Sequence, residues 1–247
     1  MVDEREQERR LRRLREAGPE ELHDLVEDLG DELSVVEARQ ALRNVFVRRE
    51  TIALLLERRR LLSSHELRRD LAGHPRTPEM AALRLLPGLP WRDVANIGRD
   101  VKIHPRVRRS ADLQLSQRLP GLTLGERISL ARFAGLGVLH KLRHDSEPRV
   151  VRAMLENPRV TEGLLLPVLT RESTPPEVLQ LIADSPRWRT SYGVRAALCR
   201  NPRAPEVRVI GWLSALRRDD LRALAANQRL SPAVRARARE LLQGTSR

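Results

Sequence analysis

Two histidines of this chain have a spacing that could bind a metal ion. His140 and His144 stand four residues apart, and Asp145 follows directly. Two histidines at that spacing share one face of a helix and can hold a metal ion. No second pair of ligands stands near them in the sequence. We therefore expect solvated or locally hydrogen-bonded histidines and no metal site.

The single cysteine and the glycines give no stronger signal. Cys199 shares a stretch with Val194 and Leu198, which indicates an apolar helix face and a buried, inert thiol. The run Gly135-Leu136-Gly137 lacks the rest of a phosphate-binding fingerprint, and neither G-x-S-x-G nor H-E-x-x-H occurs. Because no catalytic constellation emerges, we predict that the chain is not an enzyme and uses no cofactor or small-molecule substrate.

The composition favours an all-α chain. Of the 247 residues, 40% are apolar and only 2% are aromatic, while Leu, Ala, Arg and Glu dominate. These four are good helix formers, whereas sheets are usually rich in aromatic and β-branched residues.

Localisation follows from the cysteine count and the apolar runs. A single cysteine allows no disulfide within the chain, which is typical of a reducing compartment. The N-terminus is too charged for a signal peptide, and the longest apolar runs, at 51–56 and 163–169, are too short to span a bilayer. We expect a cytoplasmic protein that makes no use of a membrane.

The chain is strongly basic, with a formal net charge of +13. Residues 1–50 hold 14 acidic and 10 basic residues, and the rest of the chain holds 19 acidic and 36 basic ones. Such a field favours a polyanionic partner, either an acidic protein or nucleic acid. The excess of arginine has a second possible explanation. The chain has only two lysines, Lys102 and Lys141, and such a preference for arginine over lysine can also result from genomic base composition.

A recurring hexapeptide marks an internal repeat. HPRTPE at 74–79 returns as NPRVTE at 157–162 and as NPRAPE at 201–206. When residue 74 is aligned with residue 201, the stretch 74–115 falls on 201–242 without a gap, and 12 of those 42 positions are identical. The shift that carries residue 74 to residue 201 is called the repeat offset below.

The chemistry of the hexapeptide indicates what it separates. Asn or His suits the end of a helix, Pro prevents that helix from continuing, and Pro-Glu starts the next one. The hexapeptide therefore predicts a boundary between repeats of about 42 residues and three short helices each.

The third predicted helix of a repeat carries a Val-Arg pattern. Val107-Arg108 with Ala111, and Val234-Arg235 with Ala238, are full copies, and Val194-Arg195 is a partial one. This pattern resembles the HEAT/armadillo-like α-solenoids. The resemblance implies an all-α, right-handed α-solenoid of about five three-helix repeats, which bind other macromolecules along a concave face.

The expected domain organisation has three parts. Residues 1–31 form N-terminal charged and capping helices, the first of them exposed as far as Gly18, residues 32–243 form the repeat domain, and residues 244–247 form a tail.

Arginines of the third helices have two interpretations. In the first, Arg108, Arg195 and Arg235 pair with acidic residues of neighbouring helices, with Asp93, Asp184 and Asp220 as the expected partners. In the second, they belong to a basic stripe that binds the partner. The expected partner-binding residues of the second interpretation are Arg68, Arg69, Arg108, Arg109, Arg152, Arg195, Arg235 and Arg239, joined by Trp188 and Tyr192 as one exposed aromatic patch.

The expected function is that of a non-catalytic scaffold that binds an acidic protein through an arginine-rich concave face. The alternative is a HEAT-like nucleic-acid-binding protein similar to the DNA glycosylases that use tryptophans and a catalytic Asp on a basic face. Trp91 and Asp93 could serve as such a tryptophan and catalytic Asp. However, Asp93 recurs as Asp220 in the second copy of the repeat, which indicates that Asp93 is an acidic residue at a helix start.

Overall fold

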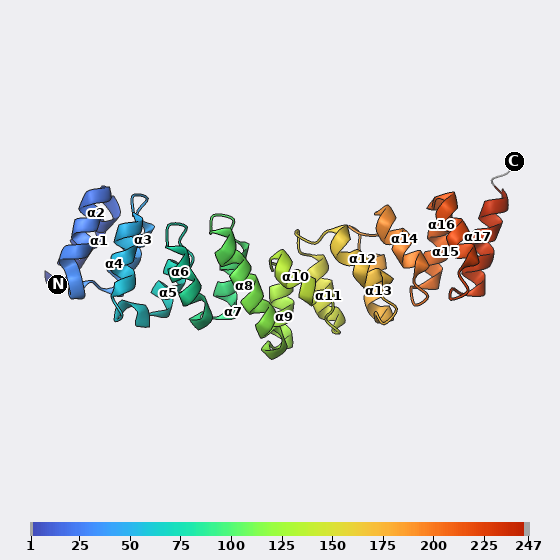
Figure 1. Ribbon diagram of the computed structural model, residues 1–247, viewed down its shortest axis with the longest axis horizontal. Coiled ribbons are helices and arrows are strands. Elements are labelled where there is room, and N and C mark those ends of the chain that lie inside the picture. Colours follow the sequence, from blue (N-terminus) through green and yellow to red (C-terminus); the bar gives the residue numbers. More distant parts are fainter. Residues whose placement is uncertain (1, 245–247) are drawn as a thin grey trace. The chain divides into compact units, whose positions relative to one another are not determined.

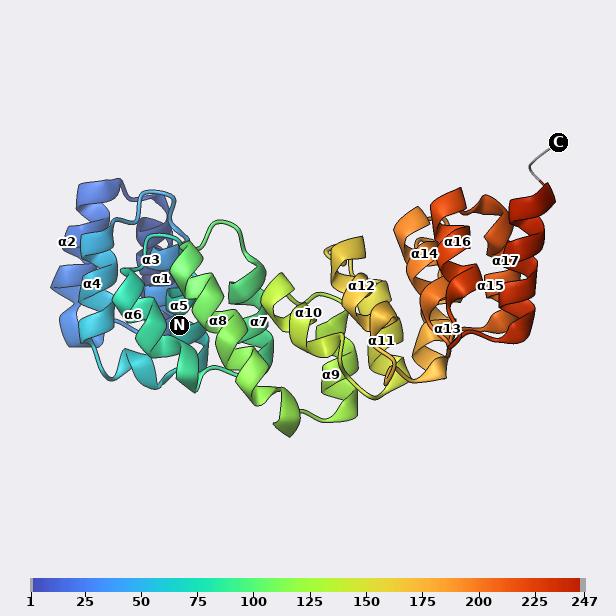
Figure 2. The same cartoon turned by 45° about the vertical axis from the view of Figure 1, so that its right-hand side comes forward.

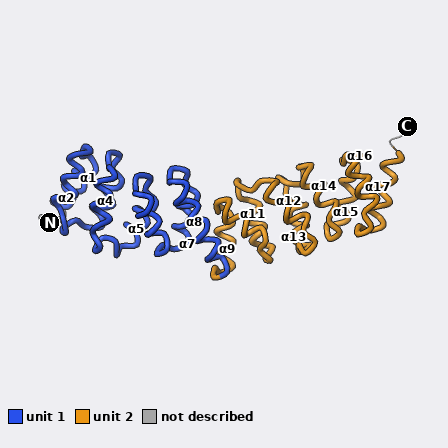
Figure 3. The backbone as a smooth tube through the Cα atoms, viewed as in Figure 1, with its two compact units in different colours: residues 1–120 blue, residues 121–247 orange. Residues whose placement is uncertain are grey.

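The structure, a computed structural model, describes the backbone of residues 2–244 and the side chains from Arg5 onward. Its described part is all-α and contains no strand, as the composition predicted. The chain divides into two compact units, residues 1–120 (unit 1) and residues 121–247 (unit 2), which Figure 3 shows in different colours. No helix among the described residues has the length and apolar character that crossing a membrane requires.

The described residues of unit 1 contain eight α-helices that follow one another in chain order (Figure 1). They are α1 Val2–Glu16, α2 Pro19–Leu29, α3 Val35–Arg43, α4 Arg49–Glu57, α5 His65–Ala72, α6 Glu79–Leu85, α7 Trp91–Arg99 and α8 Pro105–Arg118.

Unit 2 contains nine helices within its described residues. They are α9 Leu124–Ala131, α10 Leu136–Leu142, α11 Pro148–Leu155, α12 Glu162–Thr170, α13 Pro176–Asp184, α14 Tyr192–Arg200, α15 Glu206–Trp212, α16 Arg218–Ala226 and α17 Pro232–Gly244.

Local capping chemistry sets many of the helix starts. Ser34 and Thr123 each form a capping box, in which the hydroxyl accepts a backbone N–H three residues on and a glutamate there closes the pair. Pro105 is the first residue of α8, where its missing N–H leaves no bond unmade. Helices therefore begin where the sequence predicted them, because these signals act within one turn.

Helices pack on their second neighbours as well as on their first. In unit 1, α1 contacts α3, α3 contacts α5, α2 contacts α4 and α6 contacts α8; Figure 2 shows α2 beside α4 and α1 beside α3. In unit 2, α9, α11 and α13 follow the same rule, as do α12, α14 and α16. The packing thus recurs at every second helix, whereas the sequence interpretation grouped helices by threes.

Small apolar cores run along each unit. Leu22 and Val26 of α2 are fully buried in the first core, as expected of a capping helix. Leu14 and Ala17 are also buried there, and α1 packs on α3. Most described side chains of α1 are exposed, and Leu14 gives the helix one apolar anchor against α3.

Most of unit 1 has a counterpart in unit 2. The first residues of helices α3 to α8, moved by the repeat offset, coincide with the first residues of α12 to α17, and four of the six pairs also end at equivalent residues. The short 3-10 turns Leu86–Gly88 and Leu213–Ala215 match in the same way. The sequence comparison covered 74–115 alone, so the structure extends the correspondence back to residue 35.

Side chains tie several inter-helix turns to the turn two helices earlier. Asn44, Asn157 and Asn201 are buried, and their Nδ2 atoms donate to backbone carbonyls 23 to 32 residues away along the chain. Arg76 and Arg203 donate to the carbonyls of Val45 and Glu172, which are themselves equivalent under the repeat offset. These bonds satisfy carbonyl groups that helix ends leave without an intrahelical partner.

Candidate functional site

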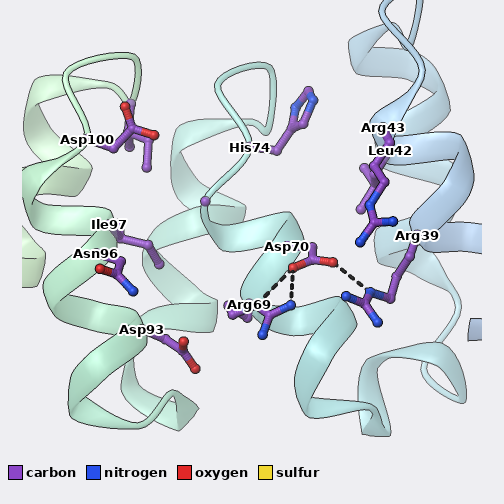
Figure 4. Close-up of a pocket in the computed structure, with 12 residues that line it drawn as sticks. Arg39, Leu42, Arg43, Arg69, Asp70, His74, Asp93, Asn96, Ile97 and Asp100 are labelled. Carbon is purple, nitrogen blue, oxygen red and sulfur yellow. Dashed lines mark hydrogen bonds and ion pairs between the residues drawn. The ribbon is translucent and has the colours of Figure 1, made fainter. Parts of the chain in front are cut away.

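A groove of about 430 Å³ lies in unit 1. Helices α3, α5 and α7 and the turns after them line it, as Figure 4 shows. Its walls carry ionisable and amide side chains above a few apolar ones. They are Arg39, Leu42, Arg43, Arg69, Asp70, Gly73, His74, Asp93, Asn96, Ile97, Asp100 and Ile103.

Asp70 of α5 is the centre of an ion-pair network in the groove. Arg39 Nε of α3 donates to one carboxylate oxygen at 2.7 Å, and Arg69 Nη2 donates to the other at 2.8 Å (Figure 4). Arg39 also pairs with Glu66, which is exposed. The hydrogen bond that Arg39 donates to Asp70, with the charges of Asp70 and Glu66, raises the pKa of Arg39 above its usual value. Arg43 lines the same wall and is exposed.

The α7 wall of the groove carries the opposite charge. Asp93 lies 2.9 Å from Nε2 of His65, with which it forms an ion pair when the ring is protonated, and is only 15% exposed. Asp100 caps the next turn by accepting the backbone N–H of Lys102 at 2.9 Å. The groove therefore presents guanidinium groups on α3 and α5 and carboxylates on α7.

Unit 2 lacks this set of charges at equivalent positions. Of the ionisable groove residues of unit 1, only Asp93 keeps its type, as Asp220. The residues that the repeat offset aligns with Arg39, Arg43, Arg69, Asp70, Asn96 and Asp100 are Leu166, Thr170, Ala196, Ala197, Ala223 and Asn227. The same helix positions therefore occur in the chain both with and without these charges.

The expected partner-binding arginines are spread over several helices. They lie on α5 (Arg68, Arg69), α8 (Arg108, Arg109), α11 (Arg152), α14 (Arg195) and α17 (Arg235, Arg239). Of these, the groove contains Arg69 alone. In unit 1, α5 packs with α3 whereas α8 packs with α6. Within unit 1, the arginines of α5 and those of α8 therefore lie on helices with different second-neighbour partners.

The expected ladder partners also differ from those in the structure. Asp93 pairs with His65, Asp184 with Arg208 and Asp220 with Arg200. Arg108 instead donates from Nε to the carbonyl of Ile103 at 3.1 Å, and Arg235 donates to Gln228. The predicted pairing of Arg108, Arg195 and Arg235 with those three aspartates is therefore wrong. Asp93 and Asp220 pair with the helix two positions earlier, and Asp184 pairs with the helix two positions later.

The expected exposed aromatic patch is absent. Trp188 is only 6% exposed and lies in the turn before α14, with the Arg187 guanidinium 4.5 Å from its ring centre. Tyr192 is half-buried, and its hydroxyl donates to Asp220. Spacing of i, i+4 implies one face only inside a helix, and Trp188 is outside it.

The two histidines and the cysteine take ordinary places. His140 is exposed on α10, while His144 lies beyond the end of that helix, so the two do not share a helix face. Among the described residues, no group of three histidine, cysteine or carboxylate side chains could hold a metal ion. Cys199 is fully buried, and this burial raises the pKa of its thiol to about 12.

Sequence reasoning missed Arg39, Arg43, Asp70, Asn96 and Asp100. One signal was present in the sequence. When residues 35–72 are aligned with 162–199, several charged residues of the first segment stand opposite apolar residues of the second. Shared helix starts with altered charges would have pointed to this groove.

Comparison with known proteins gives no relative. No protein-family model, no curated protein and no solved structure shows a significant match to this chain.

Proposed function

We propose that this chain is a non-catalytic α-solenoid of the HEAT/armadillo type that binds an acidic protein segment in the α3–α5–α7 groove of unit 1. The pairwise packing supports helical pairs, in place of the five three-helix repeats expected from spacing. One observation carries the proposal: the groove holds a set of charges that the equivalent helices of unit 2 lack.

The charges of the groove indicate what it takes up. Arg39, Arg43 and Arg69 line one wall together with a single carboxylate, Asp70. A carboxylate of the partner would dock there by bidentate pairing with a guanidinium group. Asn96 is exposed on α7 and offers an amide to the partner's backbone. The opposite wall, with its two aspartates, favours a polar or basic residue next in the segment.

The test replaces groove residues by those that unit 2 carries at the same positions. The variant combines Arg39→Leu, Arg43→Thr, Arg69→Ala and Asp70→Ala. The probe is a fluorescein-labelled poly-glutamate peptide, and binding to the full chain is read by anisotropy at low salt. We expect an affinity at least about tenfold lower in the variant, because each lost guanidinium–carboxylate pair contributes about one such factor.

A matched control removes the same net charge elsewhere in unit 1. Arg49→Ala with Arg84→Ala does so at exposed positions on α4 and α6. Equal weakening in this control, or no binding by the wild-type chain at low salt, would contradict the proposal. Circular dichroism of both variants checks that the helices remain.

Nucleic acid is the alternative partner, and a salt series separates the two. When a duplex of the same charge is titrated against the full chain, the logarithm of its binding constant falls linearly with the logarithm of the salt concentration if phosphates are neutralised. Binding of the duplex that the groove variant leaves unchanged, together with no binding of the peptide, would favour the alternative over the proposed function.

A further inference from the structure

A second cavity, of about 180 Å³, lies within unit 2 between the turn after α10 and the turn after α12. Arg143, His144 and Ser146 line one side of it, and Arg171 and Ser173 line the other. His144 and Arg171 are exposed, so the cavity opens to solvent. It contains none of the residues of the unit 1 groove.

His144 is held between two cations. Arg143 Nε donates to Nε2 of the ring at 3.1 Å, and Arg171 Nη1 lies 3.4 Å from Nδ1. Guanidinium groups only donate, and a neutral imidazole accepts at one nitrogen only. One ring nitrogen of His144 therefore carries a hydrogen that faces a guanidinium group. That ring N–H and the guanidinium N–H are both donors, and no acceptor lies between them.

One carboxylate, that of Asp145, also lines the cavity, but it does not relieve this arrangement. Asp145 is 8% exposed, pairs with Arg127 of α9 at 3.4 Å and accepts the backbone N–H of Glu147 at 3.0 Å. Lys141 at the end of α10 adds a third positive charge near His144. The site thus has positive charge from both elements that line it.

In unit 1, a buried asparagine stands at the position equivalent to Arg171. The repeat offset aligns Asn44 with Arg171, and the buried Nδ2 of Asn44 donates to the carbonyls of Leu14, Arg15 and Ala17 at the end of α1. Arg171 likewise reaches back two helices, to the end of α10, but its exposed guanidinium leaves a cavity there. The fold of these helices therefore does not require the arginine.

We propose that this cavity binds a tetrahedral oxyanion, the phosphate group of a free ion or of a monoester, between Arg143, His144 and Arg171. A dianion accepts from both guanidinium groups and from an imidazolium N–H, so it supplies acceptors for donors that face one another. The Ser146 and Ser173 hydroxyls on the two rims are further donors.

The proposal includes proton uptake by His144. Burial, then the charges of Arg143, Arg171 and Lys141, lower the pKa of His144, which favours the neutral ring before the anion binds. A bound dianion reverses the balance of charge around the ring and favours its protonated form. Asp145 contributes little to this change because Arg127 neutralises it.

The binding experiment titrates the full chain with inorganic phosphate and with phosphoserine, followed by calorimetry. We expect saturable binding that Arg143→Gln and Arg171→Gln each weaken about tenfold. The control Arg222→Gln removes one exposed charge of α16 in the same unit and should leave affinity unchanged. Tighter binding of phosphoserine identifies a monoester as the source, and equal or weaker binding identifies the free ion.

The second readout is the pKa of His144 by NMR, with sulfate as a dianion whose charge does not change in this range. Sulfate should raise this pKa in the wild type and in Arg222→Gln, and raise it less in Arg171→Gln. Absence of saturable binding, equal weakening in Arg222→Gln, or an unmoved His144 pKa would each overturn the proposal. Arg171 is exposed, so its variant is expected to fold.

Discussion

Arg60 and Arg187 stand one repeat offset apart and hold equivalent turns by the same bonds. Arg60 donates to the carbonyls of Asp31 and Leu33, and Arg187 donates to those of Pro158 and Val160, which are the equivalent residues in the second copy. Each guanidinium joins the turn after one helix to the turn two helices later. The repeat is therefore preserved as a set of side-chain-to-backbone bonds as well as in helix positions.

Loss of the Arg187 guanidinium should destabilise unit 2. Arg187→Ala leaves the carbonyls of Asn157, Pro158 and Val160 without this donor, and partial access of water limits the loss to about 1–2 kcal/mol. Arg187→Lys should restore only part of it, since an ammonium does not reach several carbonyls in one plane. Urea denaturation measures both. A neighbouring exposed residue gives the control, Arg189→Ala, and equal losses in the two alanine variants would contradict the assignment.

A fully buried asparagine should matter more than a less buried one in the same kind of turn. Asn157 is 1% exposed, donates to Ala131 and Ala134, and accepts the backbone N–H of Arg159. Asn157→Ala removes two buried bonds to carbonyls and one part-buried bond from a backbone N–H, and we expect a loss of about 2–4 kcal/mol in the free energy of unfolding.

Two further variants test that explanation. Asn157→Asp keeps the shape but sets a carboxylate against carbonyl oxygens, so it should be at least as destabilising as the alanine variant. Asn227 is half-buried and accepts the N–H of Arg229 through a solvent-exposed bond, and Asn227→Ala should cost less than about 1 kcal/mol. Similar losses for Asn157→Ala and Asn227→Ala would show that burial is not the cause.

Cys199 should resist thiol reagents in the folded protein. Its side chain is fully buried beside the carbonyl of Val209, and burial raises the pKa of the thiol to about 12. The thiolate, which is the reactive form, is therefore scarce at about pH 8. Ellman's reagent should react only after denaturant is added, and fast reaction in native buffer would contradict the buried position.

Helix starts were predictable from the sequence because their signals are local. Pro78-Glu79, Pro105 and Ser231-Pro232 indicated α6, α8 and α17, and each of these helices begins at one of those residues. A capping residue acts on the first turn that follows it, so no distant contact is needed to interpret it.

Partners across helices were not predictable in the same way. Arg39 and Asp70 are far apart in the sequence and meet only because α3 packs on α5. The sequence shows the spacing of helices but not which helices share a row, so Arg108 was assigned to Asp93 when its bond goes to Ile103. The groove follows from that packing, which a single sequence does not contain.

His74 should make the stability of the protein depend on pH. Its Nδ1 accepts the backbone N–H of Arg76 at 3.2 Å, and burial, followed by the charge of Arg76, lowers the pKa of the ring below its usual 6.5. The unfolded chain therefore binds more protons than the folded one in the interval below 6.5. Stability is complete above that value and is lost as the pH falls through the interval.

The equivalent residue of unit 2 shows how to remove this dependence. The repeat offset aligns His74 with Asn201, whose Oδ1 accepts the N–H of Arg203 while its Nδ2 donates to Leu169. His74→Asn should therefore keep the turn bond, add a donor toward the end of α3, and leave the free energy of unfolding at about pH 7.5 unchanged or higher. Between about pH 7.5 and pH 5 it should lose less stability than the wild type.

Urea denaturation at several pH values measures both effects. His140→Asn, at an exposed position on α10, is the control and should keep the pH dependence of the wild type. An unchanged slope in His74→Asn would show that His74 does not titrate with folding. A large loss of stability at neutral pH would show instead that the turns after α5 and α14 are not interchangeable, although both lie at the same place in the repeat.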